Sequence, residues 1–128
     1  MYQRYEDGDT SPASIVNISS DAGRRGTIGQ INYGAAKSGV MGITMSAARE
    51  WAASQVRVNS VCFGVVETEM TETIRSDKFR DRIMAQVPMG RFSKPEEVCQ
   101  PVCFLLSQAA SYITSQHLSV NGGYTIGV

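Results

Sequence analysis

Residues 14–19 read Ser-Ile-Val-Asn-Ile-Ser, a short run rich in β-branched residues that predicts a buried strand. Two further strands are predicted at residues 56–63 (Val-Arg-Val-Asn-Ser-Val-Cys-Phe) and 117–120 (His-Leu-Ser-Val). Helical patterns separate these runs, and this alternation implies parallel pairing through right-handed crossovers. The sequence therefore predicts an α/β fold on a parallel sheet of about three strands, with an open edge at the first or the last strand.

Two helices are predicted between the strands. Residues 32–53 carry apolar side chains at three- and four-residue spacing, and Asn32 is the expected N-cap. Residues 95–107 begin with proline followed by two glutamates, which is typical of a helix start. Pro101 lies inside this second helix, where it removes one backbone hydrogen bond and should kink the helix.

The remaining segments give weaker signals. Residues 68–87 are charged and have a helical rhythm without one apolar face, so we expect a mobile helical excursion. Residues 1–13 and 20–29 are rich in turn-forming residues and predict loops. We therefore divide the chain into a polar lead-in, 1–13, and a single domain, 14–128.

Composition excludes several functional classes. The 128-residue chain is 42% hydrophobic and 19% charged, which disfavours disorder. Its net charge is zero and no basic stripe is present, so nucleic acid is not an expected partner. No apolar run approaches the roughly 20 residues that span a membrane, and the first residues lack the apolar stretch of a secretory signal. We expect a cytoplasmic protein without a membrane partner.

The sulfur-containing residues predict core rather than a metal site. Three cysteines without framework spacing argue against disulfides, and two thiols four residues apart make a poor metal site. We expect all three to be small buried groups, and the methionines around 68–87 to fill gaps in the core. These residues are Cys62, Cys99 and Cys103, and Met70, Met84 and Met89.

The chemistry centres on Tyr33 and Lys37, which lie four apart on a predicted helix and so share a face. A tyrosine phenol titrates near roughly pH 10, but an adjacent ammonium stabilises the phenolate and favours proton exchange with a carbonyl or an alcohol. Ser20, at the end of the first strand, is placed to hold the substrate oxygen. The spacing alone is weak, because a half-buried aromatic, a solvated lysine and a turn serine explain the same residues.

A series of ordered motifs strengthens the functional interpretation. Taken together, they resemble the short-chain dehydrogenase/reductase family over about residues 14–124, and they are similar to the branch that includes 3-oxoacyl-carrier-protein reductases. The motifs are residues 15–20 (Ile-Val-Asn-Ile-Ser-Ser), Gly23, 30–37 (Gln-Ile-Asn-Tyr-Gly-Ala-Ala-Lys), 56–61, 64–70 (Gly-Val-Val-Glu-Thr-Glu-Met), 88–91, 95–98 and 118–123 (Leu-Ser-Val-Asn-Gly-Gly). The resemblance implies a partial Rossmann-like parallel sheet that forms the C-terminal catalytic half of such an enzyme.

The resemblance also implies roles for individual residues. Ser20 would orient the substrate, Tyr33 would be the general acid/base, and Lys37 would support the tyrosine and bind the nicotinamide ribose. The cofactor, NAD or NADP, would be held by Tyr33 and Lys37 together with Gly64, Val66 and Thr68. The substrate would be a small ketone or secondary alcohol, and residues 71–87 would form the lid over it. Members commonly dimerise through the helix that bears the tyrosine and through the last strand and its helix, so we expect a homo-oligomer.

One expected part of such an enzyme is absent from the sequence. No glycine-rich turn joins a strand to a helix, although such a turn holds the cofactor pyrophosphate in the family. We therefore expect the isolated chain to be inactive unless a partner or a longer parent supplies that half. The alternative is a truncated, non-enzymatic remnant that persists as an oligomer. Phe63 and Ser115 also stand where the family usually has proline and glycine.

Overall fold

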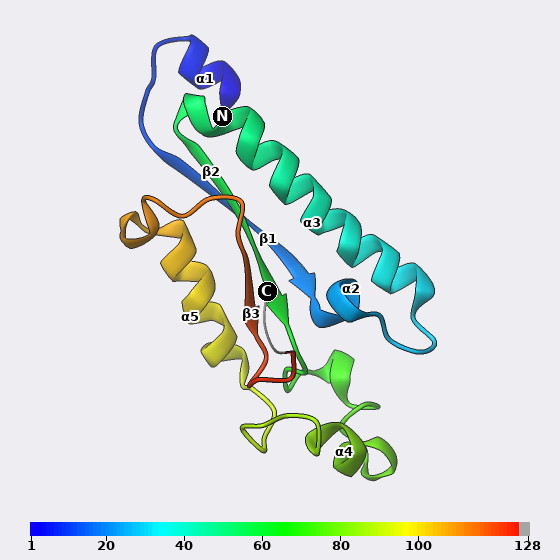
Figure 1. The fold of residues 1–128 in the computed structure, drawn as a ribbon. Helices are drawn as coiled ribbons and strands as arrows, with labels where there is room; N and C mark the ends of the chain where they lie inside the picture. Colours follow the sequence, from blue (N-terminus) through cyan, green and yellow to red (C-terminus); the bar gives the residue numbers. More distant parts are fainter. Residues whose placement is uncertain (126–128) are drawn as a thin grey trace.

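The computed structural model describes residues 1–125 and contains a three-stranded sheet between helices (Figure 1). The sheet order is β1–β2–β3, and both pairs are parallel. The strands are β1 (Ala13–Ser20), β2 (Val56–Phe63) and β3 (His117–Val120). The predicted α/β fold is confirmed, and the bounds predicted for the second and third strands agree with β2 and β3.

Helices cover the two faces of the sheet. In Figure 1, α3 lies along one face of β1 and β2, and α5 lies on the other side of the sheet. The helices are α1 (Tyr2–Glu6), α2 (Asp21–Arg25), α3 (Ile31–Trp51), α4 (Asp77–Met84) and α5 (Pro95–Leu106), with short 3-10 turns η1 (Ala52–Ser54), η2 (Glu69–Thr71) and η3 (Gln108–Ala110).

The central strand is largely buried, and its valines pack against helices on both faces of the sheet. Val56 and Val58 pack against Ala47 and Ala48 of α3. Val61 packs with Leu105 of α5 and with Ala110. Two small clusters thus pack β2 between α3 and α5. Because the strands are parallel, their carboxyl ends lie at one end of the sheet (Figure 1).

Three predictions about loops and caps were wrong. Residues 1–13 contain the short helix α1, and the Arg4 side chain of this helix forms a 3.2 Å ion pair with Asp9. Residues 20–29 were predicted as a loop but contain α2. The Ser20 hydroxyl accepts a hydrogen bond from the Ala22 amide and so caps this short helix. Helix α3 begins at Ile31 after Gln30, so Asn32 lies inside it and is not its N-cap.

The expectation of a buried sulfur core was also mostly wrong. Cys62 is buried in β2, but Cys99 and Cys103 are exposed. Both lie on α5, where the buried positions are Val98 and Leu105, so neither thiol belongs to the core. The exposed side chains also include Met70 and Met89, while Met84 is partly buried. No helix in the described part of the chain is long and apolar enough to cross a membrane.

Two further expectations concern the edges and the turn before β3. Within residues 1–125, β1 and β3 each pair on one side only, so the predicted open edges are present. Ser115 has a φ of 63°, a left-handed conformation that glycine adopts more easily. The departure at Ser115 is therefore a strained position, as expected if the turn keeps the geometry that glycine allows.

Candidate active site

A pocket with a volume of about 670 Å³ opens at the carboxyl ends of β1 and β2. This is the end of a parallel sheet at which open α/β folds bind their ligands. All six residues predicted from the sequence line it, namely Ser20, Tyr33, Lys37, Gly64, Val66 and Thr68. The fold thus brings together residues from β1, from α3 and from the loop after β2.

Tyr33 and Lys37 lie one turn apart at the start of α3. The Lys37 Nζ atom is 5.7 Å from the centre of the Tyr33 ring. The same ammonium donates a hydrogen bond of 3.0 Å to the carbonyl of Ile18 in β1. Lys37 therefore bridges the helix and the strand end, and one carbonyl engages only part of its three-donor capacity.

Ser20 is the last residue of β1 and the N-cap of α2. Its hydroxyl oxygen accepts a 3.2 Å hydrogen bond from the Ala22 amide. Because that oxygen acts as the acceptor, the hydroxyl proton is left to donate to another group in the pocket. The cap thus fixes the Ser20 side chain, which lines the same pocket as Tyr33.

The loop after β2 is held from both sides. The Gly64 amide donates to the Val120 carbonyl at 3.3 Å, and a Cβ at Gly64 would lie 2.9 Å from the Asn121 Cβ. Val66 forms a parallel bridge with Ser93, which begins the approach to α5. Gly64 is therefore required for the close approach of the loop to the segment after β3.

Thr71 and Arg75 lock the far end of this loop. The Thr71 hydroxyl donates to the Val66 carbonyl, and it also caps the turn that starts at Thr68. Arg75 donates to the Thr71 hydroxyl at 3.1 Å and to the Thr68 carbonyl at 2.9 Å. Thr71 lines the pocket but was not predicted, because a threonine three residues after Thr68 does not match the Ser/Thr-x-x-Glu/Gln signal of a capping box.

The sequence also missed pocket residues that come from α5. Pro95, Val98 and Cys99 lie in the pocket wall opposite α3. Only the packing of α5 across the sheet brings them there, because more than 50 residues separate them from Tyr33. Nothing in the spacing of the motifs indicates this contact.

A second pocket of about 360 Å³ adjoins the first and shares Ser20, Tyr33 and Phe63 with it. Ile74 and Ile83, from the segment predicted as the lid, line it together with Tyr124. Phe63 also packs against the core cluster around Val61 and Leu105. The phenyl ring that replaces the expected proline thus forms a common wall of both pockets.

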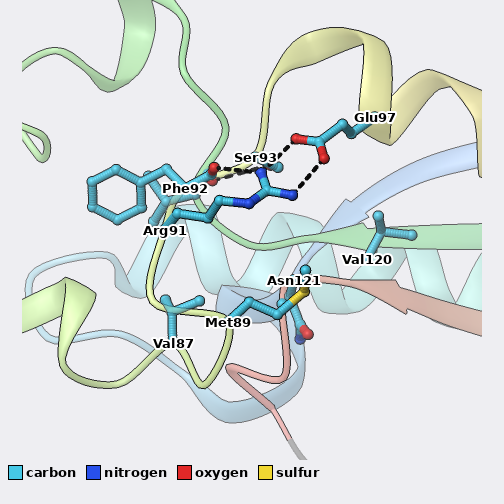
Figure 2. Close-up of a pocket in the computed structure, with 10 residues that line it drawn as sticks. Val87, Met89, Arg91, Phe92, Ser93, Glu97, Val120 and Asn121 are labelled. Carbon is cyan, nitrogen blue, oxygen red and sulfur yellow. Dashed lines mark hydrogen bonds and ion pairs between the residues drawn. The ribbon is translucent and has the colours of Figure 1, made fainter.

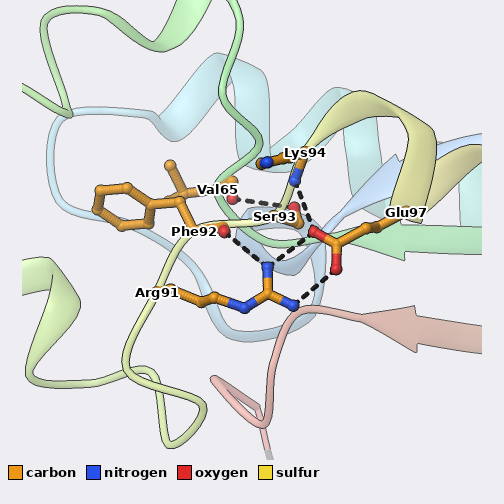
Figure 3. A network of polar contacts seen from close by, with 6 residues as sticks. All are labelled: Val65, Arg91, Phe92, Ser93, Lys94 and Glu97. Atoms are coloured by element: carbon orange, nitrogen blue, oxygen red, sulfur yellow. Dashed lines mark hydrogen bonds and ion pairs between the residues drawn. The ribbon is translucent and has the colours of Figure 1, made fainter.

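A third, small pocket of about 140 Å³ lies beyond the active-site loop and contains none of the predicted site residues (Figure 2). The Arg91 guanidinium reaches both carboxylate oxygens of Glu97, at 2.7 and 2.6 Å. Figure 3 shows the same carboxylate accepting the Lys94 amide at 2.9 Å. Glu97 thus caps α5 and ties it to the segment beside Val65.

The Arg91–Glu97 pair predicts a specific response to acid. The hydrogen bonds from Arg91, followed by the one from the Lys94 amide, lower the pKa of Glu97 to about 2 from a normal 4.5. A carboxyl with a lowered folded-state pKa contributes stability above its unfolded pKa and loses it as the pH falls through the folded pKa. The contribution of Glu97 should therefore be complete above pH 4.5 and disappear toward pH 2.

The measurement is the free energy of unfolding against pH for the wild type, Glu97→Gln and Glu96→Gln. Glu96 is the matched control, because it lies in the same first turn of α5 and is exposed as well. The difference between the wild type and Glu97→Gln should shrink below pH 4.5, whereas Glu96→Gln should parallel the wild type. Equal pH slopes for all three proteins would contradict the ion pair.

The comparisons with known proteins agree with this geometry. The profile of a family described as enoyl-(acyl carrier protein) reductase matches residues 3–125. The chain is 47% identical to a 3-oxoacyl-[acyl-carrier-protein] reductase of Thermotoga maritima, over 88% of the chain and 46% of that protein. It is 48% identical to an acetoacetyl-CoA reductase of Synechocystis sp., over 97% of the chain and 49% of that protein.

Solved structures show the same fold. A protein from Agrobacterium tumefaciens assigned as a 2-deoxy-D-gluconate 3-dehydrogenase, with bound NADP, has a TM-score of 0.88 at 36% identity, over 94% of this chain and 49% of that one. A short-chain dehydrogenase/reductase from Brucella melitensis has a TM-score of 0.83 at 38% identity, over 89% and 46% of the two chains. The chain spans about half the length of the relatives that it matches.

Proposed function

The chain belongs to the short-chain dehydrogenase/reductase family, and we propose that residues 14–128 form the catalytic half of an NAD(P)-dependent oxidoreductase. The reaction is hydride transfer between a nicotinamide and a ketone or secondary alcohol. One observation carries the proposal: Ser20, Tyr33 and Lys37 line a single pocket with the loop residues Gly64, Val66 and Thr68.

In this proposal Tyr33 is the general acid/base. In ketone reduction its hydroxyl donates a proton to the carbonyl oxygen, and in alcohol oxidation it takes that proton back. Lys37 stabilises the phenolate through its positive charge, from a position already fixed by the Ile18 carbonyl. Ser20 donates its free hydroxyl proton to the same substrate oxygen, which holds the carbonyl beside Tyr33.

The pocket fits the nicotinamide end of the cofactor. When bound, the nicotinamide supplies or accepts the hydride. Lys37 has unused hydrogen-bond donors for a ribose hydroxyl. Gly64 and Val66 would offer backbone groups to the nicotinamide, and Gly64 has no side chain in the way. Thr68 adds a hydroxyl at the loop end. These groups would hold the ring and its ribose and exclude water from the face toward Tyr33.

The adjoining pocket suggests the substrate class. Its wall toward the lid is apolar, formed by Met70, Ile74 and Ile83, while Ser20 and Tyr33 lie at the other side. The relatives are named 3-oxoacyl-[acyl-carrier-protein] reductase and acetoacetyl-CoA reductase. We therefore propose a small 3-oxoacyl compound as substrate, with its carbonyl at Tyr33 and its chain along the lid.

The proposal extends to assembly and location. We propose a homo-oligomer, supported by exposed apolar side chains on α3 (Ile43 and Met45) and on α5 (Phe104 and Leu106). Such side chains on a stable protein favour burial against another subunit. We propose the cytoplasm as its compartment, in line with three free cysteines among the described residues.

The test separates the nicotinamide pocket from the rest of the dinucleotide site. The isotope-labelled chain is titrated with reduced nicotinamide mononucleotide, NADH and NADPH, and amide shifts are followed. We expect the mononucleotide to shift Gly64, Val66 and Thr68 at millimolar concentration. Lys37→Met should weaken this, and Lys78→Met, on exposed α4, should not.

Each outcome is informative. Micromolar binding of NADPH or NADH would mean that an assembly of this chain completes the dinucleotide site. Weak binding of all three nucleotides, with the same shifts, is the result expected for a catalytic half. Absence of any shift would overturn the proposal and favour the non-enzymatic alternative.

A further inference from the structure

A part-buried polar pair joins three segments beside the active-site pocket. Asp21, which directly follows Ser20, is only 3% exposed. The Asn121 side chain, just after β3, donates a 2.8 Å hydrogen bond to the Asp21 carboxylate. The other end of the Asn121 amide accepts the Gly123 amide proton at 3.0 Å. Asn121 also lies against Gly64, because a Cβ added at Gly64 would be only 2.9 Å from the Asn121 Cβ.

Two more contacts tie α2 to β3 and to the segment that follows it. Arg24 donates to the Ser119 hydroxyl at 2.6 Å. Arg25 donates to the Tyr124 hydroxyl at 2.5 Å, and its guanidinium lies 3.9 Å from the centre of that ring. Helix α2 has only five residues, too few to be stable without such contacts. The geometry of Ser20, its N-cap, therefore depends on the segment after β3.

The pair is costly to bury. The Asp21 Oδ1 atom has no hydrogen-bond partner of normal geometry among the described residues, although the Thr125 hydroxyl lies close enough to lower the pKa of Asp21. Burial raises the pKa of Asp21, while Asn121, Thr125 and the two arginines of α2 act against that rise. A buried carboxylate with an unsatisfied oxygen is weak evidence for stability and better evidence for a required geometry.

We propose that Asp21 and Asn121 are a positioning pair that fixes Ser20 on one side of the pocket relative to the Gly64 loop on the other. The proposal rests on the function proposed above and adds two residues that touch neither hydride nor proton. The pair acts through Ser20, because a shift of α2 moves the serine hydroxyl away from Tyr33. It acts through Gly64, because Asn121 is the surface on which that loop rests.

The test is a reciprocal exchange of the two side chains. Asn121→Asp places two carboxylates at a hydrogen-bond distance, where they repel each other. Asp21→Asn alone keeps an acceptor and should have a milder effect. Asp21→Asn combined with Asn121→Asp restores one donor and one acceptor, and the new carboxylate can still accept the Gly123 amide. Rescue by the exchange identifies a direct pair, and it keeps the test valid where Asn121→Asp alone folds poorly.

The first readout is amide hydrogen exchange at Ala22 and Gly64, which needs no activity. We expect Asn121→Asp to speed exchange at both amides about tenfold, as loss of a buried hydrogen bond implies, and the double variant to return toward the wild type. Asn17→Ala is the matched control, because it removes a part-buried side-chain hydrogen bond to Thr44 away from the pocket. It should lower stability without changing exchange at Ala22 and Gly64.

The second readout is a split between kcat and KM in ketone reduction. A positioning role predicts that Asn121→Asp lowers kcat about 100-fold, as misplacement by about 1 Å does, with KM for the cofactor changed little. Unchanged exchange at Ala22 and Gly64 in Asn121→Asp, or no rescue in the double variant, would overturn the pair. Failure of the wild type to bind any nicotinamide nucleotide would overturn the proposed function instead, and the exchange data would still decide on the pair.

Discussion

Replacing Tyr33 by phenylalanine is expected to lower the rate of ketone reduction about 10²–10⁴-fold, the usual contribution of a general acid. The change removes one hydroxyl and keeps the ring against which Lys37 lies at 5.7 Å. The lysine, held by the Ile18 carbonyl, therefore stays in place. Binding of nicotinamide nucleotides should weaken far less than the rate falls, because the loop at Gly64 is untouched.

The measurement is the consumption of NADPH with a soluble 3-oxoacyl ester at saturating cofactor, for the wild type and two variants. Tyr112→Phe is the control, because Tyr112 is fully exposed. Tyr112 lines neither the active-site pocket nor the adjoining pocket. A Tyr33→Phe protein that keeps most of the wild-type rate would show that another group supplies the proton. An isolated wild-type chain that reduces no ketone is the expected result if the other half of the enzyme is required, and the Tyr33→Phe comparison is then made in the assembly or longer parent that supplies that half.

The strands could be predicted because their burial leaves a local signal. Residues 56–63 contain three valines, and the strand lies between α3 and α5, so the predicted bounds coincide with those of β2. The location of the site could be predicted from the same strands. Ser20 ends β1 and Gly64 directly follows β2, and the carboxyl ends of neighbouring parallel strands meet at one edge of a sheet. Strand order, and not the motif alone, puts these residues in one pocket.

What the sequence could not show depends on contacts between distant residues. Helix α2 looked like a loop, because its short length and its glycine hide a cap that Ser20 provides. Its partner Asn121 is 100 positions away from Asp21, so no local pattern reveals the bond. The exposure of Cys99 follows only from which face of α5 meets the sheet. Long-range packing, and not local propensity, decided each of these cases.

Replacing Gly23 by alanine is expected to be the most damaging change outside the catalytic groups. An added Cβ would lie 2.6 Å from the carbonyl carbon of Lys37 and 2.8 Å from the Ser38 amide nitrogen. These are backbone atoms of α3 and cannot turn aside, so α2 must move away. We expect the free energy of unfolding to fall by about 1–3 kcal/mol, the range for overpacking in a well-packed site.

The same shift should disturb the chemistry. It would stretch the 2.5 Å hydrogen bond from the Ser38 hydroxyl to the Gly23 carbonyl and separate Ser20, at the start of α2, from Lys37 on α3. We therefore expect kcat to fall about 100-fold in addition to the loss of stability, because catalytic geometry tolerates little displacement. Urea unfolding and ketone reduction measure the two effects separately.

Gly39→Ala provides the control, since Gly39 lies on the same helix as Lys37 and a Cβ there meets nothing within 4 Å. That variant should gain up to about 1 kcal/mol, because glycine disfavours a helix interior. Opposite signs for the changes in the free energy of unfolding of the two variants would show that the close contact with α3, and not helix propensity, requires glycine at position 23. If Gly23→Ala were as stable and as active as Gly39→Ala, the close packing of α2 on α3 at Gly23 would be contradicted. The position of Ser20 near Tyr33 could then not be explained by that packing.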